Sequence, residues 1–484
     1  MIETLKQIWP ILTALAVILL ALVTAGHAVI YKRNPRSAVA WLGVILMFPL
    51  VGALLYILLG INRIQRRASD LRSRERATQS PLTTQACSLK ELANRLPNDV
   101  EYLATLAHLV NRVTGTPLLK GNHIRPMLNG DEAYPFMIEA LEAAQHSITL
   151  CTYIFAHDRA GKMFTKALGD AVRRGVEVRV LIDYAGSRYS FPPVEIPLRR
   201  AGVRTALFMP TLNPLRTAYT NLRSHRKILV VDGRIGFTGG INIRNDNLLK
   251  EKPRFPVQDI HFRMEGPVVN QLQQAFAEDW AFTTREKLTG EPWFVPIETA
   301  GSVIARGITD GPDEDYDKLR QTILGALACA RRKIRVMTPY FLPDSDLIAV
   351  LNTAALRGVD VEIFVPQKNN LRLVGWAIRA HLWQVLERGC KVYLTAPPFE
   401  HTKIMTVDDT WSLIGSANWD PRSLRLNFEF NVEAYSVELA GALNGIIDRK
   451  CDTARQEVTL AEMDARRLPV RLRDGIARLF FPYL

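Results

Sequence analysis

The segment H-R-K-I-L-V-V-D-G-R-I-G-F-T-G-G-I-N, His225 to Asn242, carries more reactive side chains than any other window of the chain. His225 and Lys227 are two residues apart at the start of an apolar run, and on a strand this spacing puts both side chains on one face. Asp232 is an odd number of residues from His225, so it is predicted to point to the other face and to be structural. The Asp-Gly pair that it begins predicts a hairpin whose second strand brings Asn242 back towards His225.

The same pattern occurs a second time further along the chain. His401, Lys403 and Asp408 repeat the spacing, and a single such pattern can arise by chance whereas two are improbable. A stretch of small residues closes each copy, with Gly239, Gly240 and Asn242 in the first and Gly415, Ser416 and Asn418 in the second. Small side chains and an amide suit an anionic group that approaches the backbone closely.

The two copies resemble the signature of the phospholipase D superfamily, H-x-K-x4-D followed by G-[GS]-x-N, at every signature position. The resemblance implies one site shared by two halves of the chain and a covalent phosphohistidine intermediate. It assigns His225, Lys227, Asp232, His401, Lys403 and Asp408 to catalysis, and Gly240, Asn242, Ser416, Asn418 and Glu429 to substrate binding.

The chemistry open to these residues is attack on a phosphodiester. The substrate is already negative, so cations such as Lys227 and Lys403 must offset the charge that develops in the transition state. One neutral imidazole attacks phosphorus while the other, protonated, donates to the leaving oxygen, and the roles reverse when a new hydroxyl arrives. This scheme requires no metal and no cofactor. The residues do not decide which ring attacks, and the resemblance favours His225.

In the superfamily an acidic residue downstream of each motif orients a histidine ring. Glu429 in N-F-E-F and Asp259 in Q-D-I-H stand in comparable places in this chain. As lone residues, each would equally suit an ordinary surface ion pair.

The pattern of apolar runs predicts a duplicated α/β fold. The first half has strands at Ile148–Phe155 and Val176–Ile182 around a helix at Phe164–Arg174, and the second half has a strand at Ile334–Phe341 and a helix at Leu347–Arg357. The duplication covers most of residues 130–435. We therefore expect two phospholipase D-like α/β/α domains related by a pseudo-twofold axis, with His225 and His401 at one cleft.

The N-terminal region is predicted to contain two transmembrane helices. Ile8 to Tyr31 is almost continuously apolar and long enough to cross a bilayer, and a second apolar run, Ala38 to Ile61, contains Pro49. A signal peptide and a pair of buried helices are the alternatives. Six arginines between Arg63 and Arg76 outweigh the basic residues of the connecting turn, which predicts that both termini are cytoplasmic.

The predicted organisation is two transmembrane helices at 1–62, a juxtamembrane linker or helical segment at 63–115, a first domain at 116–290, a second domain at 291–465, and an amphipathic membrane-contacting tail at 466–484. Segment 187–224 is rich in Pro and Arg and is either an irregular lid or a surface excursion. The tail combines arginines with aromatic and aliphatic residues, as interfacial anchors do, although docking onto the catalytic domain is an alternative.

Composition restricts the partner and the compartment. The formal charge of +13 implies an anionic partner, which charge alone leaves open between nucleic acid and an anionic lipid surface. The five cysteines are odd in number and scattered, which predicts a reducing compartment.

Several activities share the signature, and the remaining motifs favour one of them. The double apolar run, T-P-Y-F-L-P-D at Thr338–Asp344 and L-V-G-W-A-I-R-A at Leu373–Ala380 resemble the bacterial cardiolipin synthases of the phospholipase D type. The resemblance implies a multi-pass protein of the bacterial inner membrane, with cytoplasmic catalytic domains, that transfers a phosphatidyl group between two phosphatidylglycerol molecules. It implies phosphatidylglycerol and anionic membrane lipids as partners and no nucleic acid, and leaves a homo-oligomer open. A phospholipase D-type hydrolase, a membrane-tethered nuclease and phosphatidylethanolamine as donor are the alternatives.

Overall fold

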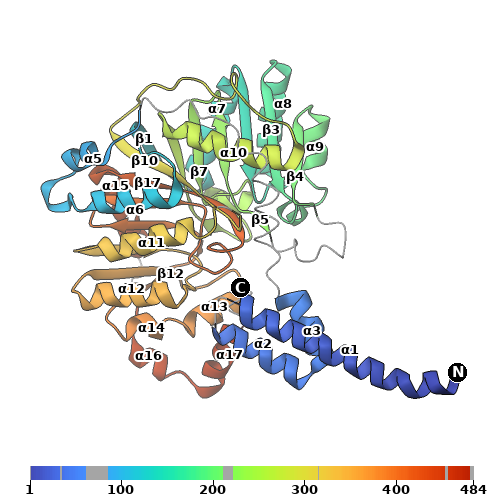
Figure 1. Cartoon of the computed structure of the whole chain (residues 1–484). Coiled ribbons are helices and arrows are strands. Elements are labelled where there is room, and N and C mark those ends of the chain that lie inside the picture. The colour runs from blue at the N-terminus through green and yellow to red at the C-terminus, as the bar shows by residue number, and fades with distance from the viewer. Residues whose placement is uncertain are drawn as a thin grey trace. The chain divides into compact units, whose positions relative to one another are not determined.

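The computed structural model describes residues 2–32, 35–60, 85–210, 222–313, 315–452 and 456–479. The chain divides into an N-terminal helical unit and a larger α/β unit, drawn in Figure 1. The basic residues expected at the membrane surface, Arg63 to Arg76, lie outside the described residues, as do 211–221 of the Pro/Arg-rich segment and the last five residues of the tail.

The helical unit contains one long apolar helix, α1 (Ile2–Tyr31), and a second apolar run that is divided into shorter pieces. These pieces are α2 (Pro35–Met47), α3 (Pro49–Leu55) and a π-helical turn, η1 (Tyr56–Gly60). Within the part of the chain that the structure describes, only Ile8–Tyr31 is long and apolar enough to count as a membrane span. The uninterrupted second transmembrane helix is therefore not confirmed, because Phe48 leaves the helical conformation (φ −134°, ψ 75°) before Pro49, whose ring disfavours a helical residue ahead of it.

The α/β unit is built on one long mixed sheet in which two similar halves join through β1 and β10. From that junction outwards, the first half runs β1 (Leu119–Leu128), β9 (Ile260–Glu265), β7 (Ile235–Gly239), β6 (Ile228–Val231), β2 (Ser147–Thr152), β3 (Glu177–Asp183) and β4 (Arg204–Phe208). The second half runs β10 (Val303–Asp310), β17 (Asn427–Tyr435), β16 (Trp411–Gly415), β15 (Ile404–Val407), β11 (Lys333–Met337), β12 (Asp360–Pro366), β13 (Lys391–Thr395) and the edge strand β18 (Gln456–Val458). The two orders match strand for strand up to β4 and β13, which confirms the predicted α/β duplication.

Helices cover the sheet on both faces, and each half has its own outer layer (Figure 1). In the first half these helices are α7 (Asn129–Ala143), α8 (Arg159–Arg173) and α9 (Glu195–Arg200), and in the second half they are α11 (Lys318–Cys329), α12 (Ser345–Leu356), α13 (Arg372–Arg379) and α14 (Trp383–Leu386). The helices α10 (Val268–Thr284) and α15 (Val437–Asp452) pack into one apolar core that draws on the strands of both halves. This shared core holds the two halves together as one body.

Two helices that precede the first half pack on the second half instead. They are α5 (Leu89–Arg95) and α6 (Leu103–Thr114), which sequence analysis placed in the juxtamembrane segment. Leu106 and Val110 of α6 are buried in the same core as α11 and α12, and Arg306 of β10 donates to Ala107 O at 3.1 Å. Residues 85–115 are therefore an integral layer of the α/β unit.

The C-terminal residues form two more helices, α16 (Leu460–Asp464) and α17 (Leu468–Leu479). The helix α17 packs against α13, where the Arg473 guanidinium lies 4.4 Å from the ring of Trp376. Its apolar side chains Leu468, Leu472, Ile476 and Leu479 are all at least half exposed.

Candidate active site

Each motif histidine follows a two-residue strand that pairs with the opposite half of the sheet. His225 follows β5 (Arg223–Ser224), which is parallel to β17, and its N–H donates to Phe428 O at 2.9 Å. His401 follows β14 (Phe399–Glu400), which is parallel to β8 (Val257–Gln258), and its N–H donates to Gln258 O at 2.7 Å. The backbone of each histidine is thus anchored on the half that does not contain it.

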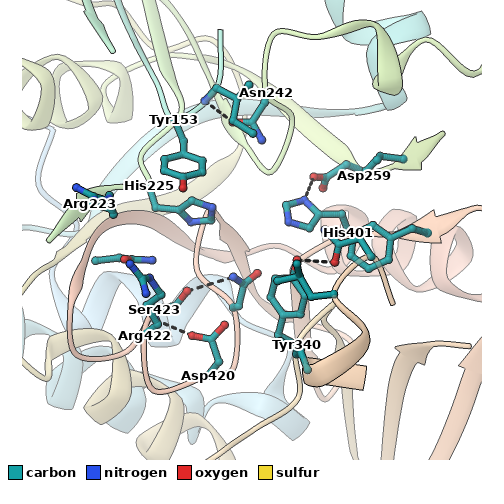
Figure 2. A pocket seen from close by; sticks show the side chains of 18 of the residues that line it. Tyr153, Arg223, His225, Asn242, Asp259, Tyr340, His401, Asp420, Arg422 and Ser423 are labelled. Carbon is teal, nitrogen blue, oxygen red and sulfur yellow. Dashed lines mark hydrogen bonds and ion pairs between the residues drawn. The ribbon is translucent and has the colours of Figure 1, made fainter. Parts of the chain in front are cut away.

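The carboxylates that orient the rings are crossed in the same way. Nδ1 of His225 lies 2.9 Å from Glu429 Oε1, and Nδ1 of His401 lies 2.7 Å from Asp259 Oδ2. Both acids are fully buried. A proton held on Nδ1 by a carboxylate leaves Nε2 with its lone pair, and Figure 2 shows both rings turned to the space between the halves. The two downstream acids therefore orient the rings, and Glu429 is not in a position to bind substrate directly.

The electrostatics of the site keep both rings neutral. Burial lowers the pKa of His225, and Glu429 opposes that effect. Burial, aided by the Lys403 ammonium, lowers the pKa of His401 to about 3. Burial acts to raise the pKa of Glu429, yet His225 and Lys227 bring it down to about 2. A bound phosphate anion is what would allow one imidazole to carry a proton.

The two motif lysines are almost completely buried next to the histidines. Lys227 Nζ donates to His225 O at 2.8 Å, while Lys403 Nζ donates to His401 O and lies 3.8 Å from Asp259 Oδ2. Burial lowers the pKa of Lys227 to about 7, aided by the Lys403 ammonium, and burial lowers the pKa of Lys403 to about 8 against the effect of Asp259. An arriving anion would stabilise their charged forms, so this pair is suited to hold a phosphate.

Only two of the predicted substrate-binding residues line the cavity, the asparagines. Asn242 Oδ1 accepts from Ile154 N–H at 3.1 Å, and Asn418 Nδ2 donates to Ser423 Oγ at 3.2 Å. Ser416 instead donates its hydroxyl to Glu429 Oε2 at 2.5 Å. A Cβ at Gly240 would lie 2.2 Å from Asp259 Oδ1. Ser416 and Gly240 therefore support the two carboxylates, and neither is retained as a substrate-binding residue.

The aspartates of the signature lie away from the cavity. Asp232 accepts backbone N–H bonds from Gln145, His146 and Ser147 at 2.7 to 2.9 Å, which ties the β6–β7 hairpin to the start of β2. Asp408 accepts from the N–H groups of residues 331–333 at 2.7 to 2.8 Å and ties β15–β16 to β11. The parity argument for a structural Asp232 agrees with this geometry, whereas the grouping of both aspartates with the catalytic residues does not.

The two histidines line one cavity of about 600 Å³ between the halves. The ring of Tyr153 stands edge-on to His225 with centroids 5.4 Å apart, and Tyr340 stands edge-on to His401 at 6.1 Å. Sequence reasoning missed both tyrosines, although Tyr153 directly follows the end of β2 and Tyr340 lies three residues beyond the end of β11. It also did not place Arg223 and Arg422 in the cavity.

Comparisons with known proteins find similarity along almost the whole chain. The family model described as cardiolipin synthase, PLD-like domain, matches residues 137–280 and 323–450, and a phospholipase D-nuclease N-terminal model matches residues 11–60. A cardiolipin synthase of Geobacillus kaustophilus is 33% identical over 99% of this chain and 94% of its own length. A cardiolipin synthase of Alkalihalophilus pseudofirmus is also 33% identical, over 99% of this chain and 95% of its own.

One solved structure supports the fold at lower identity. The phosphatidylserine synthase of Haemophilus influenzae superposes with a TM-score of 0.59 at 16% identity, covering 78% of this chain and all of that one. At this identity the likeness concerns the fold alone.

Proposed function

Because the chain belongs to the family of phospholipase D-like cardiolipin synthases, we propose that it joins two phosphatidylglycerol molecules into cardiolipin and releases glycerol. The observation that carries the proposal is the pair of histidines on one cavity, each with Nδ1 on a buried carboxylate of the opposite half. Such an arrangement provides two Nε2 atoms that face a single phosphate.

In the proposed mechanism the two rings exchange roles between two steps. Nε2 of one histidine attacks the phosphorus of the donor, and the glycerol oxygen leaves with a proton from the other ring. That second ring then removes the proton from the hydroxyl of the acceptor, which attacks the phosphohistidine and frees the first ring. Lys227 and Lys403 offset the charge on the phosphate oxygens in both steps.

The test supplies phosphatidylglycerol in mixed micelles and measures cardiolipin and free glycerol. Wild type is expected to form them in equal amounts, and His225→Ala and His401→Ala are each expected to lower the rate at least about a hundredfold. His123→Ala, at an exposed position on β1, is the matched control. Phosphatidic acid as the only lipid product would identify a hydrolase, and full activity in either site variant would rule out the paired-histidine mechanism.

We further propose that the helical unit crosses the inner membrane twice and leaves the α/β unit in the cytoplasm. The run from Ser37 to Gly60 has no charged residue, so α2, α3 and η1 together can return through the bilayer despite their break. A cysteine placed at Asn34 is expected to react with a membrane-impermeant thiol reagent added to spheroplasts. The partly exposed Cys329 is expected to react only after lysis, and the opposite pattern would reverse the orientation.

The exposed stripe on α17 supports the proposal that the C-terminal helix contacts the membrane. Leu468, Leu472, Ile476 and Leu479 face outwards, and five arginines stand between residues 466 and 478. Apolar side chains flanked by cations suit an anionic bilayer surface. Replacing Leu472 with Glu is expected to lower the activity of the protein reconstituted in vesicles of phosphatidylglycerol, and unchanged activity in such vesicles would contradict this role.

A further inference from the structure

The pseudo-twofold symmetry of the cavity breaks two residues before each histidine. Arg223 precedes His225 on β5, and Phe399 precedes His401 on β14. Both side chains line the cavity. The flank beside His225 therefore carries a cation at a position where the flank beside His401 carries an aromatic ring.

A second guanidinium, that of Arg422, joins the cationic flank. Asn427 is the register partner of Arg223 between β17 and β5, and its N–H donates to Arg422 O at 2.9 Å. Burial raises the pKa of Tyr153, and the charges of Arg422 and Arg223 both oppose that rise. Figure 2 shows Arg223 and Arg422 on the side of the cavity that holds His225, with Asp259 and His401 on the other side.

Two carboxylates lie near this flank, and backbone N–H groups donate to both of them. Asp183 lies 4.0 Å from Arg223 Nε, but its oxygens accept N–H bonds from residues 185, 186 and 224. Asp420 lines the cavity and accepts from Ser423 N–H at 2.7 Å. Burial raises the pKa of each of these two acids to about 6.

The proposed reaction itself requires two phosphate sites. In the proposed mechanism the phosphate under attack is served by Lys227 and Lys403, whose ammonium groups donate to the carbonyls of the two histidines. The acceptor brings a second phosphate, joined to its reacting hydroxyl by a glycerol, which must lie to one side of the rings during transfer. Two guanidiniums are well suited to that second anion, because each can donate two parallel hydrogen bonds to phosphate oxygens.

We propose that Arg223 and Arg422 form a second phosphate-binding site that holds the phosphate of the acceptor while the hydroxyl of the acceptor reacts. The inference rests on the proposed function and deepens it. In the step concerned, the N–P bond of the phosphohistidine breaks, an O–P bond to the acceptor forms, and the hydroxyl proton passes to the second histidine. A lipid phosphodiester and a free glycerol phosphate share the chemistry that this site recognises, whereas water and glycerol lack it.

The experiment compares acceptors that share one covalent intermediate. The full-length protein is given phosphatidylglycerol as donor together with radiolabelled glycerol, so cardiolipin formation and label exchange into phosphatidylglycerol are measured in the same sample. A parallel arm replaces the labelled glycerol with labelled glycerol 3-phosphate, which separates a free phosphate from a lipid headgroup. The variants are Arg223→Gln and Arg422→Gln, with Arg223→Lys as the charge-retaining variant.

The matched control is Arg425→Gln. Arg425 lies three residues beyond Arg422, is about half exposed and pairs with Asp344 at 3.1 Å. It is not among the residues that line the cavity.

We expect the ratio of cardiolipin formation to glycerol exchange to fall about tenfold to a hundredfold in both glutamine variants. Arg223→Lys is expected to recover part of the ratio and Arg425→Gln to keep the wild-type ratio. If transfer to glycerol 3-phosphate falls together with cardiolipin formation, the site recognises the phosphate itself. If that transfer is unchanged, the site recognises the lipid phosphodiester.

Equal losses in both reactions, or no loss in either, would overturn the second site while leaving the synthase assignment intact. Wild-type protein that exchanges glycerol but forms no cardiolipin would instead overturn the proposed function, and the second site with it.

Discussion

The His225 corner and the His401 corner of the cavity share a motif and differ in what surrounds it. His225 is held by Glu429, which also accepts from the Ser416 hydroxyl at 2.5 Å. His401 is held by Asp259, whose carboxylate occupies the space that a side chain at Gly240 would fill. The longer acid thus has a hydroxyl behind it and the shorter acid has a glycine. The duplication preserves the positions of the two rings while each corner builds its support differently.

The crossing of the supports also explains why the two halves form one body. Each histidine takes its backbone partner and its carboxylate from the other half, so neither half contains a complete corner. A relative shift of the halves would move each ring away from its acid. The shared core of α10 and α15 is what prevents such a shift.

The largest effect is expected when a crossed carboxylate loses its charge. Glu429→Gln and Asp259→Asn should each lower kcat about a hundredfold or more, because the ring loses the group that holds its tautomer and stabilises its protonated form. Steady-state rates on phosphatidylglycerol across pH 5 to 9 would measure this. Since each acid acts to raise the pKa of its own histidine, the residual activity should also shift to lower pH. A raised KM with an unchanged kcat would show that the acids bind substrate instead.

The contrast between Gly240 and Ser416 predicts unequal effects of the same alanine. Gly240→Ala puts a methyl group 2.2 Å from Asp259 Oδ1 and should displace the carboxylate from His401, lowering kcat about tenfold to a hundredfold. Ser416→Ala only removes one of the donors to Glu429 and should cost about threefold to tenfold. Equal losses in the two variants, measured with the thermal midpoint unchanged, would mean that the two corners are supported alike.

The repeat in the sequence predicted the strands and the two rings, since these depend on local spacing, and the resemblance to the superfamily pointed to the two acids. It did not predict the pairing, because His225 and Glu429 are 204 residues apart and His401 and Asp259 are 142 apart. Packing between the halves decides such contacts. For the same reason α6 was expected beside the membrane and instead covers the second half, whereas the helix break at Pro49 depends on a local steric rule that the sequence already contained.

The two lysines predict a pH dependence that separates free protein from complex. Burial lowers the pKa of Lys227 to about 7 and that of Lys403 to about 8, so both ammonium groups lose their protons as the pH rises past 8. The value of kcat/KM should then fall by about tenfold per pH unit for each lysine that must be charged. A bound phosphate raises both pKa values, so kcat should stay level to higher pH. A kcat/KM that is flat up to pH 10 would contradict this.

The smallest effect on the chemistry is expected at the signature aspartates, which hold loops and not rings. Asp408→Asn and Asp232→Asn each weaken three backbone hydrogen bonds and should destabilise the fold by about 1 to 3 kcal/mol. Activity per folded molecule should stay within about twofold of wild type. It is obtained by scaling single-turnover amplitudes to the folded fraction. Thermal unfolding in detergent measures the stability loss. A structural role lowers the amount of folded protein before it lowers the rate per folded molecule. A variant that keeps its thermal midpoint and loses as much rate as His225→Ala would therefore show that these carboxylates are catalytic.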